Sequence, residues 1–144
     1  MKFSSLSRIL VIAAATASPL CAEPARTPTP LRALTMVEPG QWDLRSRVQP
    51  TENRSICVTD PAVLLQLRHG GATCNRFVIT NDPQVTTVQY SCTGTGTGRT
   101  TVRVETPRLV QIESQGIVNR EPFLIALEGR HTGACAAAAI GARR

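Results

Sequence analysis

The sequence predicts an α+β domain that is mostly β: a single antiparallel meander sheet, curved or half-barrel in shape, with one short helix near residues 61–69 and two disulfides. Stretches in which apolar and polar residues alternate recur along the chain, as in strands with one buried and one wet face. Short runs of turn-forming residues separate these stretches, which favours the pairing of consecutive strands. Of the five cysteines, the four that lie beyond the N-terminal segment indicate two cross-links if the chain is exported.

Residues 1–22 have the layout of a secretory signal peptide. Basic residues come first, residues 9–17 form an apolar run, and small residues follow. The run is far shorter than the roughly 20 apolar residues that cross a bilayer. Cleavage after Ala17 or after Ala22 fits the pattern, and the later cut also removes Cys21 and leaves an even number of cysteines. The sequence therefore predicts export to the periplasm and a mature protein that does not span the membrane.

Composition divides the rest of the chain into three parts. Residues 23–36 are rich in proline and predict a flexible, extended leader, with order beginning near Leu34 or Pro39. Residues 37–136 carry the alternating patterns and have the length of one domain. Residues 137–144 have no packing signal and predict a disordered tail.

The first predicted strand follows the turn dipeptide Pro39-Gly40. Its apolar residues alternate with charged ones from Trp42 to Val48. Trp42 is the only tryptophan, and we expect it to anchor the core. A second strand is predicted over residues 55–59.

A short helix is predicted to follow the second strand. Asp60 is an N-cap residue, Pro61 suits the first helical position, and the glycines at 70–71 would end the helix. The apolar side of this helix would consist of Val63, Leu64 and Leu67.

The second half of the chain predicts a series of hairpins. Strands over 76–80 and 85–92 flank the turn residues 81–83. Residues 93–98 alternate threonine and glycine and predict a flexible hairpin loop. A phosphate-binding loop would need a helix directly after the glycines, and a β pattern follows instead. The remaining strands are predicted over 100–105, 109–118 and 123–132.

The hairpin geometry favours one pairing of the cysteines. If residues 82–83 lie at the centre of the turn, Cys74 and Cys92 are almost equally far from it on opposite strands. Cys57 and Cys135 are then left to join the early part of the domain to its last strand. This is the preferred one of the three connectivities that four cysteines allow.

Candidate catalytic or metal-binding groups are few. His131 and Cys135 have a spacing that zinc sites tolerate, and His69 lies near Cys74, but an oxidising compartment would cross-link these thiols. Single acids are expected on the wet faces of strands: Glu105, Glu113 and Glu128. The sequence contains no serine–histidine–aspartate order and no paired-carboxylate motif. It therefore predicts no catalytic residue, no metal and no cofactor, and a protein that is not an enzyme.

The charge pattern argues against a nucleic-acid partner. The formal net charge is +6, but the arginines are scattered singly, often beside acids, and aromatic residues make up only 3% of the chain. Single-stranded nucleic acid is bound by stacking on aromatic side chains, so too few platforms are present.

Three features together resemble a known bacterial envelope family. They are Pro-Gly-Gln-Trp at 39–42, four spaced cysteines, and Gly-Arg-His-Thr-Gly-Ala-Cys at 129–135. The family is catalogued as domain of unknown function 3617, and the resemblance covers nearly all of the mature chain. It implies a short exported protein of a Gram-negative bacterium with structural cysteines, and it implies no activity. The chain departs from the family in having His131-Thr132 where a basic–apolar pair is expected.

These observations lead to two hypotheses of function. The first is a non-catalytic periplasmic domain that binds a small or lipidic ligand or supports envelope homeostasis. A curved sheet offers a concave face for such a ligand, and Trp42, Tyr90 and Phe123 would line it unless they belong to the core. The second is a protein-interaction or inhibitor module that presents the loop at 93–98 to an envelope protein.

Overall fold

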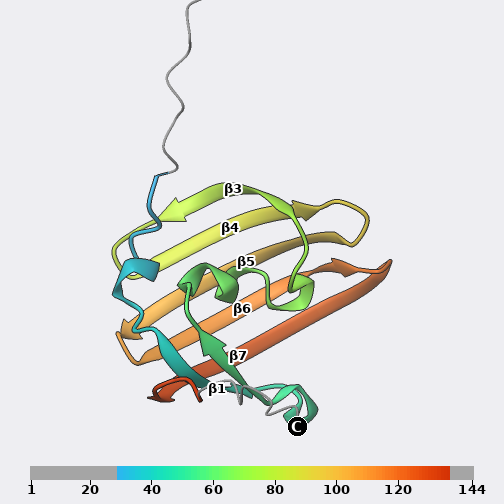
Figure 1. The fold of residues 1–144 in the computed structure, drawn as a ribbon. Helices are drawn as coiled ribbons and strands as arrows, with labels where there is room; N and C mark the ends of the chain where they lie inside the picture. Colours follow the sequence, from blue (N-terminus) through green and yellow to red (C-terminus); the bar gives the residue numbers. More distant parts are fainter. Residues whose placement is uncertain (1–28, 137–144) are drawn as a thin grey trace, which may run out of the picture.

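The computed structural model describes residues 29–136, which form one seven-stranded antiparallel sheet (Figure 1). The strands are β1 (Gly40–Ser46), β2 (Arg54–Val58), β3 (Cys74–Asn81), β4 (Val85–Cys92), β5 (Gly96–Thr106), β6 (Leu109–Val118) and β7 (Glu121–Gly133). The short 3-10 segments are η1 (Leu34–Met36), η2 (Pro50–Glu52), η3 (Pro61–Leu65) and η4 (Leu67–His69). The predicted fold class is confirmed: the protein is mostly β, with a meander sheet and two disulfides. The predictions for residues 1–22 and 137–144, and the 23–28 part of the predicted leader, fall outside the described residues.

The order of the strands in the sheet is β2-β1-β7-β6-β5-β4-β3. Strands β3 to β7 follow one another through hairpins, as the short predicted turns require. Strand β1 then pairs with the free side of β7, where Trp42 lies opposite His131 and Leu44 opposite Gly129. The first strand of the chain is thus hydrogen-bonded to the last, and β2 and β3 form the two edges of an open sheet.

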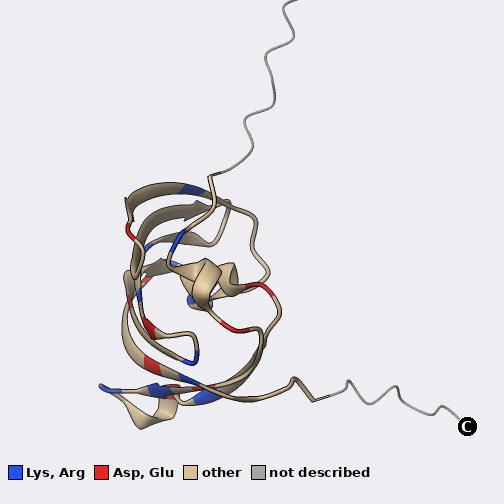
Figure 2. Ribbon diagram, turned by 90° about the vertical axis from the view of Figure 1, so that its left-hand side faces the viewer, with Lys and Arg blue, Asp and Glu red and all other residues tan. Residues whose placement is uncertain are grey.

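Strong curvature gives the sheet a concave side and a convex side. Seen from the side, the strands curl around the 3-10 segments (Figure 2). Alternate residues of the inner strands are buried on the concave side while their neighbours are exposed, as in β5, where Val102 and Val104 are buried and Arg103 is exposed. The largest fully buried side chains include Trp42, Tyr90, Leu44, Ile112 and Leu127. Period-2 alternation therefore builds the core, as the sequence predicts.

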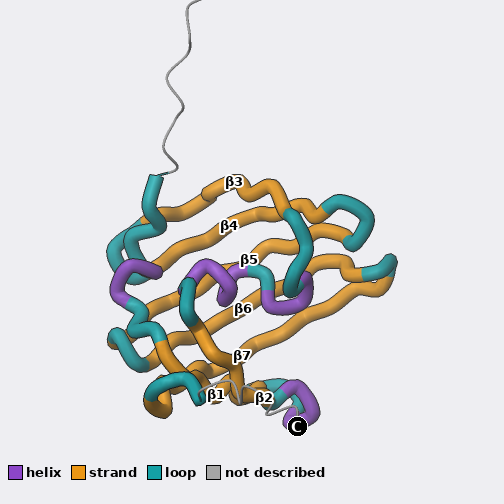
Figure 3. The backbone as a smooth tube through the Cα atoms, viewed as in Figure 1, coloured by secondary structure: helices purple, strands orange, loops and turns teal. Residues whose placement is uncertain are grey.

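The concave side of the sheet is filled by the chain itself. In Figure 3, η1, η3 and η4 lie in front of the strands, whereas η2 lies at the β1–β2 edge of the sheet. They bring Leu34, Leu64 and Leu65 into the same core cluster as the strand side chains. A ligand therefore finds no open concave face here, contrary to what the first hypothesis assumed.

The helix predicted near 61–69 is wrong in kind. The segment forms two 3-10 turns, η3 and η4, which are separated at Gln66, where the backbone adopts φ −137° and ψ 42°. Asp60 does cap η3, because its Oδ1 accepts a hydrogen bond from the amide of Ala62 at 2.9 Å. The apolar side also differs from the prediction, since Leu65 is buried and Val63 is 39% exposed. A segment this short gains little from helix propagation, so core packing decides its shape.

Order begins earlier than the proline-rich composition indicated. The flexible leader predicted over residues 23–36 is wrong from residue 29 onward, because residues 29–36 include η1, and Ala33 and Leu34 are buried in the core. Asn81 holds this segment against β3: its Oδ1 accepts from the amide of Arg32 at 2.8 Å, and its Nδ2 donates to the carbonyl of Pro30 at 3.2 Å. Few apolar residues suffice because they enter a core that the sheet has already built.

Half of the threonine–glycine tract is strand. Only residues 93–95 form the turn between β4 and β5, and Gly96 to Gly98 belong to β5. A side chain at Gly98 would overlap the phenol of Tyr90, and one at Gly116 on β6 would overlap the backbone of Thr97. These glycines permit close packing inside the sheet, so the predicted flexible loop over 93–98 is corrected to a three-residue turn.

Both disulfides have the predicted partners. Cys74 on β3 lies directly opposite Cys92 on β4 and is bonded to it. Cys57 on β2 is bonded to Cys135, which follows the end of β7. The second bond connects an edge strand to the C-terminal end of the domain across the start of β1.

Candidate functional site

An apolar groove lies where the N-terminal segment meets η3. One wall consists of Leu31, Leu34, Thr35, Val37 and Pro39, and the other of Asp60, Pro61 and Ala62. Its volume is about 400 Å³, which falls in the range of sites for small molecules. All but two of the lining residues are apolar, so burial of apolar surface would be the main source of affinity for any occupant.

Backbone hydrogen bonds hold both walls of the groove. In the first wall, the amide of Val37 donates to the carbonyl of Leu34 at 3.2 Å, and the amide of Glu38 donates to that of Pro107 at 2.9 Å. In the second wall, Asp60 caps η3 and Pro61 fixes the first turn. The groove is therefore formed in advance by the fold, which reduces the entropy cost of binding.

The chemistry that this groove offers is limited. Its polar side chains are the carboxylate of Asp60, which already accepts from the amide of Ala62, and the hydroxyl of Thr35, which donates to the carbonyl of Arg32 at 2.7 Å. Among the lining residues there is no histidine, cysteine, lysine or arginine to serve as a base or nucleophile. The arrangement suits the binding of an apolar group.

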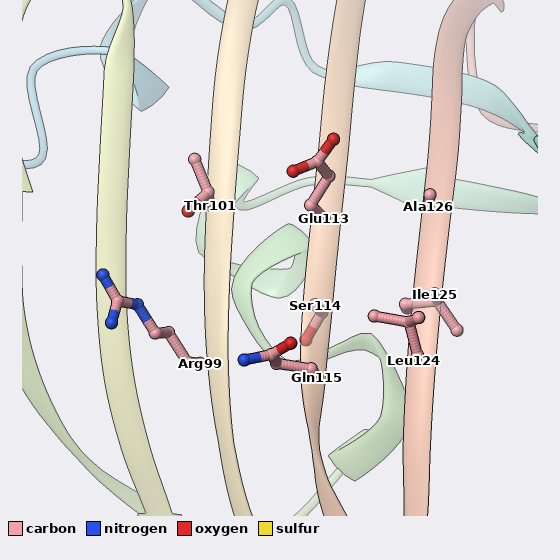
Figure 4. Close-up of a pocket in the computed structure, with 8 residues that line it drawn as sticks. All are labelled: Arg99, Thr101, Glu113, Ser114, Gln115, Leu124, Ile125 and Ala126. Atoms are coloured by element: carbon pink, nitrogen blue, oxygen red, sulfur yellow. The ribbon is translucent and has the colours of Figure 1, made fainter.

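A second hollow lies on the convex face of β5, β6 and β7 (Figure 4). It has a volume of about 370 Å³, and Arg99, Glu113, Gln115 and Leu124 surround the small side chains of Thr101 and Ala126. Arg47 approaches it from the end of β1 and pairs with Glu113 at 3.2 Å. Most of the residues around the hollow are polar, so it offers less apolar surface than the groove.

The three aromatic residues expected to line a ligand site do not come together at one. Trp42 is fully buried, and its Nε1 donates to the carbonyl of Glu38 at 3.0 Å. Tyr90 is 1% exposed, and Phe123 is half-buried beside η4. Trp42 and Tyr90 are thus core residues, the alternative that the sequence left open.

His69 belongs to a buried polar network. Its Nε2 donates to the carbonyl of Ile117 at 3.1 Å, which leaves Nδ1 to accept from the Tyr90 hydroxyl at 3.2 Å. Nearby, the hydroxyls of Thr100 and Ser114 lie 2.7 Å apart. Burial raises the pKa of Tyr90, and the hydrogen bonds to Ser114 and Thr100 oppose that rise. Both ring nitrogens of His69 are therefore engaged in holding η4 against the sheet.

His131 and Cys135 are not metal ligands in this arrangement. His131 packs edge-on against Trp42, with ring centroids 5.7 Å apart, and its Nε2 donates to the carbonyl of Pro39 at 3.2 Å. Cys135 is bonded to Cys57. Between residues 29 and 136, no group of three metal-ligating side chains lies close enough together to hold an ion.

The acids expected on wet faces lie there. Glu105 and Glu113 are exposed, and Glu128 is half-buried. Hydrogen bonds from Gln111 and Arg130 lower the pKa of Glu128, and the Arg130 contact is 2.7 Å long. The Glu113 and Glu128 carboxylates are thus paired with neighbouring polar side chains.

Sequence reasoning missed the groove because it placed one wall in a flexible leader. A signal was present: Leu31, Leu34 and Val37 recur every three residues, which is the period of a 3-10 turn that presents one apolar side.

Within the described residues, no helix is long and apolar enough to cross a membrane. The chain matches no protein-family model, no curated protein and no solved structure.

Proposed function

We propose that this chain is an exported, periplasmic, non-catalytic domain that binds a small or lipidic apolar ligand in the groove between residues 31–39 and 60–62. Its resemblance to the uncharacterised envelope family, and a role in envelope homeostasis, are parts of the same proposal. Two disulfides support an oxidising compartment, since such bonds persist outside the cytosol.

The observation that carries the proposal is the groove itself. It is the hollow in which apolar side chains predominate on both walls, and backbone hydrogen bonds and the Asp60 cap hold those walls. Exposed apolar surface of this kind costs free energy in water, and an alkyl chain or an aromatic ring would cover it. The convex hollow around Thr101 lacks that property.

A neutral fluorescent probe tests the proposal directly. N-phenyl-1-naphthylamine becomes bright in apolar surroundings, and it has no charge that the arginines could attract. We expect saturable binding to the full chain, and we expect Ala62→Trp to abolish it because the indole fills the groove. Thr35→Trp reaches the same space from the opposite wall and should act in the same way.

The matched control is Ala126→Trp, which places the same indole in the convex hollow. We expect this variant to bind the probe as the original chain does. Thermal unfolding of all the variants shows whether each is folded. Equal probe binding by Ala62→Trp and by the original chain would refute the groove as the site.

A second candidate function is protein interaction through the end of the sheet at residues 93–95. The observation in its favour is that this turn lies beside the turn at 119–120: the amide of Asn119 donates to the carbonyl of Thr95 at 2.8 Å. Ile117 at the same end is 48% exposed. The two turns and Ile117 thus form one surface with an apolar centre.

Site-specific photo-crosslinking tests the second candidate. A photoreactive amino acid at Thr93 should capture an envelope protein in living cells, whereas the same group at the exposed Arg103 on the convex face should not. Deleting all of 93–98 would remove part of β5, so the test has to leave Gly96 to Gly98 in place. Equal capture from both positions would rule this surface out.

A further inference from the structure

Arg54 carries an unused pair of hydrogen-bond donors. It is the first residue of β2 and pairs with Leu44, so its side chain lies on the concave side of the sheet. Its Nε and Nη2 atoms are buried and hydrogen bond to nothing among residues 29–136. Nε–H and one Nη2–H bond form one edge of the planar guanidinium and point the same way. This edge is the fork that binds two oxygens at once.

The charge of this fork has to be balanced. A guanidinium stays protonated at any ordinary pH, so it cannot become neutral by losing a proton. Burying such a charge without a partner is costly. Arg54 as a whole is only half-buried, so its cluster lies toward the surface rather than inside the closed core.

The charged neighbours of Arg54 are Glu52 and Arg68. Burial lowers the pKa of Arg54, the Glu52 carboxylate raises it, and the positive charge of Arg68 lowers it. Glu52 already accepts from Nη1 of Arg68 through both carboxylate oxygens, at 3.3 and 3.4 Å. Arg68 also lies over the ring of Phe123, 5.8 Å from its centroid. One carboxylate therefore serves two guanidiniums, and the cluster is short of one negative charge.

We propose that Arg54 binds an oxyanion, a carboxylate or a phosphate, through its Nε and Nη2 edge, with Arg68 as the second positive charge. Two coplanar oxygens match the fork, and charge-assisted bonds of this kind are stronger than neutral ones. The bound anion supplies the missing negative charge. This site shares no residue with the apolar groove, so it extends the proposed function and does not depend on it.

The other buried polar atoms without a partner in the described part of the chain do not make the same case. None of them belongs to a group with a permanent charge: they are the hydroxyls of Thr86 and Thr95, Oε1 of Gln111 and Nδ1 of His131. A neutral atom can be satisfied by water and exerts no net attraction on an anion. Among these side chains, Arg54 combines a permanent positive charge with two parallel N–H donors that can bind two oxygens.

Nuclear magnetic resonance of the arginine side chains tests the site in the full chain. The Nε–Hε signal of Arg54 is assigned as the one missing from Arg54→Lys. Sodium acetate and sodium phosphate are titrated separately, against sodium chloride at matched ionic strength. We expect a saturable shift of the Arg54 signal with at least one oxyanion and none with chloride. Saturation with acetate alone points to a carboxylate ligand, and saturation with phosphate alone points to a phosphorylated one.

Two lysine variants separate the fork from simple charge. Arg54→Lys keeps the positive charge but loses the fork, so we expect about tenfold weaker oxyanion binding, measured by calorimetry. Arg103→Lys, on the convex face, should leave the affinity unchanged. A shift at Arg54 that grows linearly and matches that of Arg103 would overturn the proposal, because it would report ionic screening alone. That titration uses the unmodified chain, so it remains decisive even if Arg54→Lys is unstable.

Discussion

The core tolerates no methyl group at Gly129 unless its neighbours give way. Gly129 on β7 lies directly opposite Val110 on β6. A Cβ added to Gly129 would lie 2.8 Å from Cγ2 of Val110 and 3.0 Å from Cδ2 of Leu44. Overpacking of this kind lowers the free energy of unfolding by about 1–3 kcal/mol. Alanine also reduces the conformational entropy of the unfolded chain, which raises the free energy of unfolding by about 0.4–1 kcal/mol. We therefore expect a net loss of about 0.5–2 kcal/mol.

Combining Gly129→Ala with Val110→Ala should relieve much of this overpacking. Val110→Ala alone removes two methyl groups from a fully buried side chain and should cost about 2–3 kcal/mol. In the double variant, the methyl group added at position 129 no longer meets Cγ2 of Val110, and it fills part of the cavity. We expect the double variant to be more stable than the sum of the single losses predicts, by about 1–2 kcal/mol.

Urea unfolding measured by tryptophan fluorescence gives these energies. Trp42 is the only tryptophan, and its Cε3 lies 3.4 Å from the added methyl position. Gly70→Ala is the control, since a Cβ there meets nothing within 4 Å, and it should be neutral or slightly stabilising. If the loss of unfolding free energy in the double variant equals the sum of the two single losses to within about 0.5 kcal/mol, the packing argument is refuted.

Three further predictions follow from named contacts. Tyr90, the only tyrosine, has a raised pKa in the fold because it is buried, so its contribution to stability should be complete below pH about 10 and lost as the pH rises further. Phenolate absorbance should then appear together with unfolding, and a phenolate signal from a still folded chain would contradict this. Asp60→Ala should lower the unfolding free energy by about 1 kcal/mol and speed hydrogen exchange at the amide of Ala62, which loses its acceptor; unchanged exchange would contradict the cap. Replacing Cys57 and Cys135 by alanine should cost about 4 kcal/mol in denaturant titrations, because this bond closes a chain segment with a sequence separation of 78, against 18 for the β3–β4 bond. A cost below about 1 kcal/mol would show that the edge strand is held by its hydrogen bonds alone.

Much of the fold could be predicted from local patterns. The alternation of apolar and polar residues indicated the strands, because each inner strand buries one face and exposes the other to solvent. Val102, which is buried, and Arg103, which is exposed, illustrate this. The pairing of Cys74 with Cys92 was predicted from near-symmetry about the turn. The register next to the turn, with Asn81 opposite Thr86, would place Cys92 opposite Asn75, and the bulge between Val78 and Thr80 shifts it so that Cys92 lies opposite Cys74. Local rules were sufficient where the partners are close in the sequence.

The features that the sequence did not predict depend on contacts between distant residues. Gly98 looked like part of a loop because its role, making room for the ring of Tyr90, exists only once the sheet has formed. Leu34 looked like part of a leader because its core partners come from strands far along the chain. The unsatisfied fork of Arg54 likewise depends on Glu52 being occupied by Arg68. No window of sequence contains such information.

The pairing of β1 with β7 has a consequence for how the protein is made. Strand β1 leaves the ribosome early, yet one of its two neighbours is the last strand to be synthesised. The sheet cannot be completed before β7 has been synthesised, and contacts between such distant residues form slowly. The growing chain thus keeps β1 without the partner on one of its two sides until β7 has emerged.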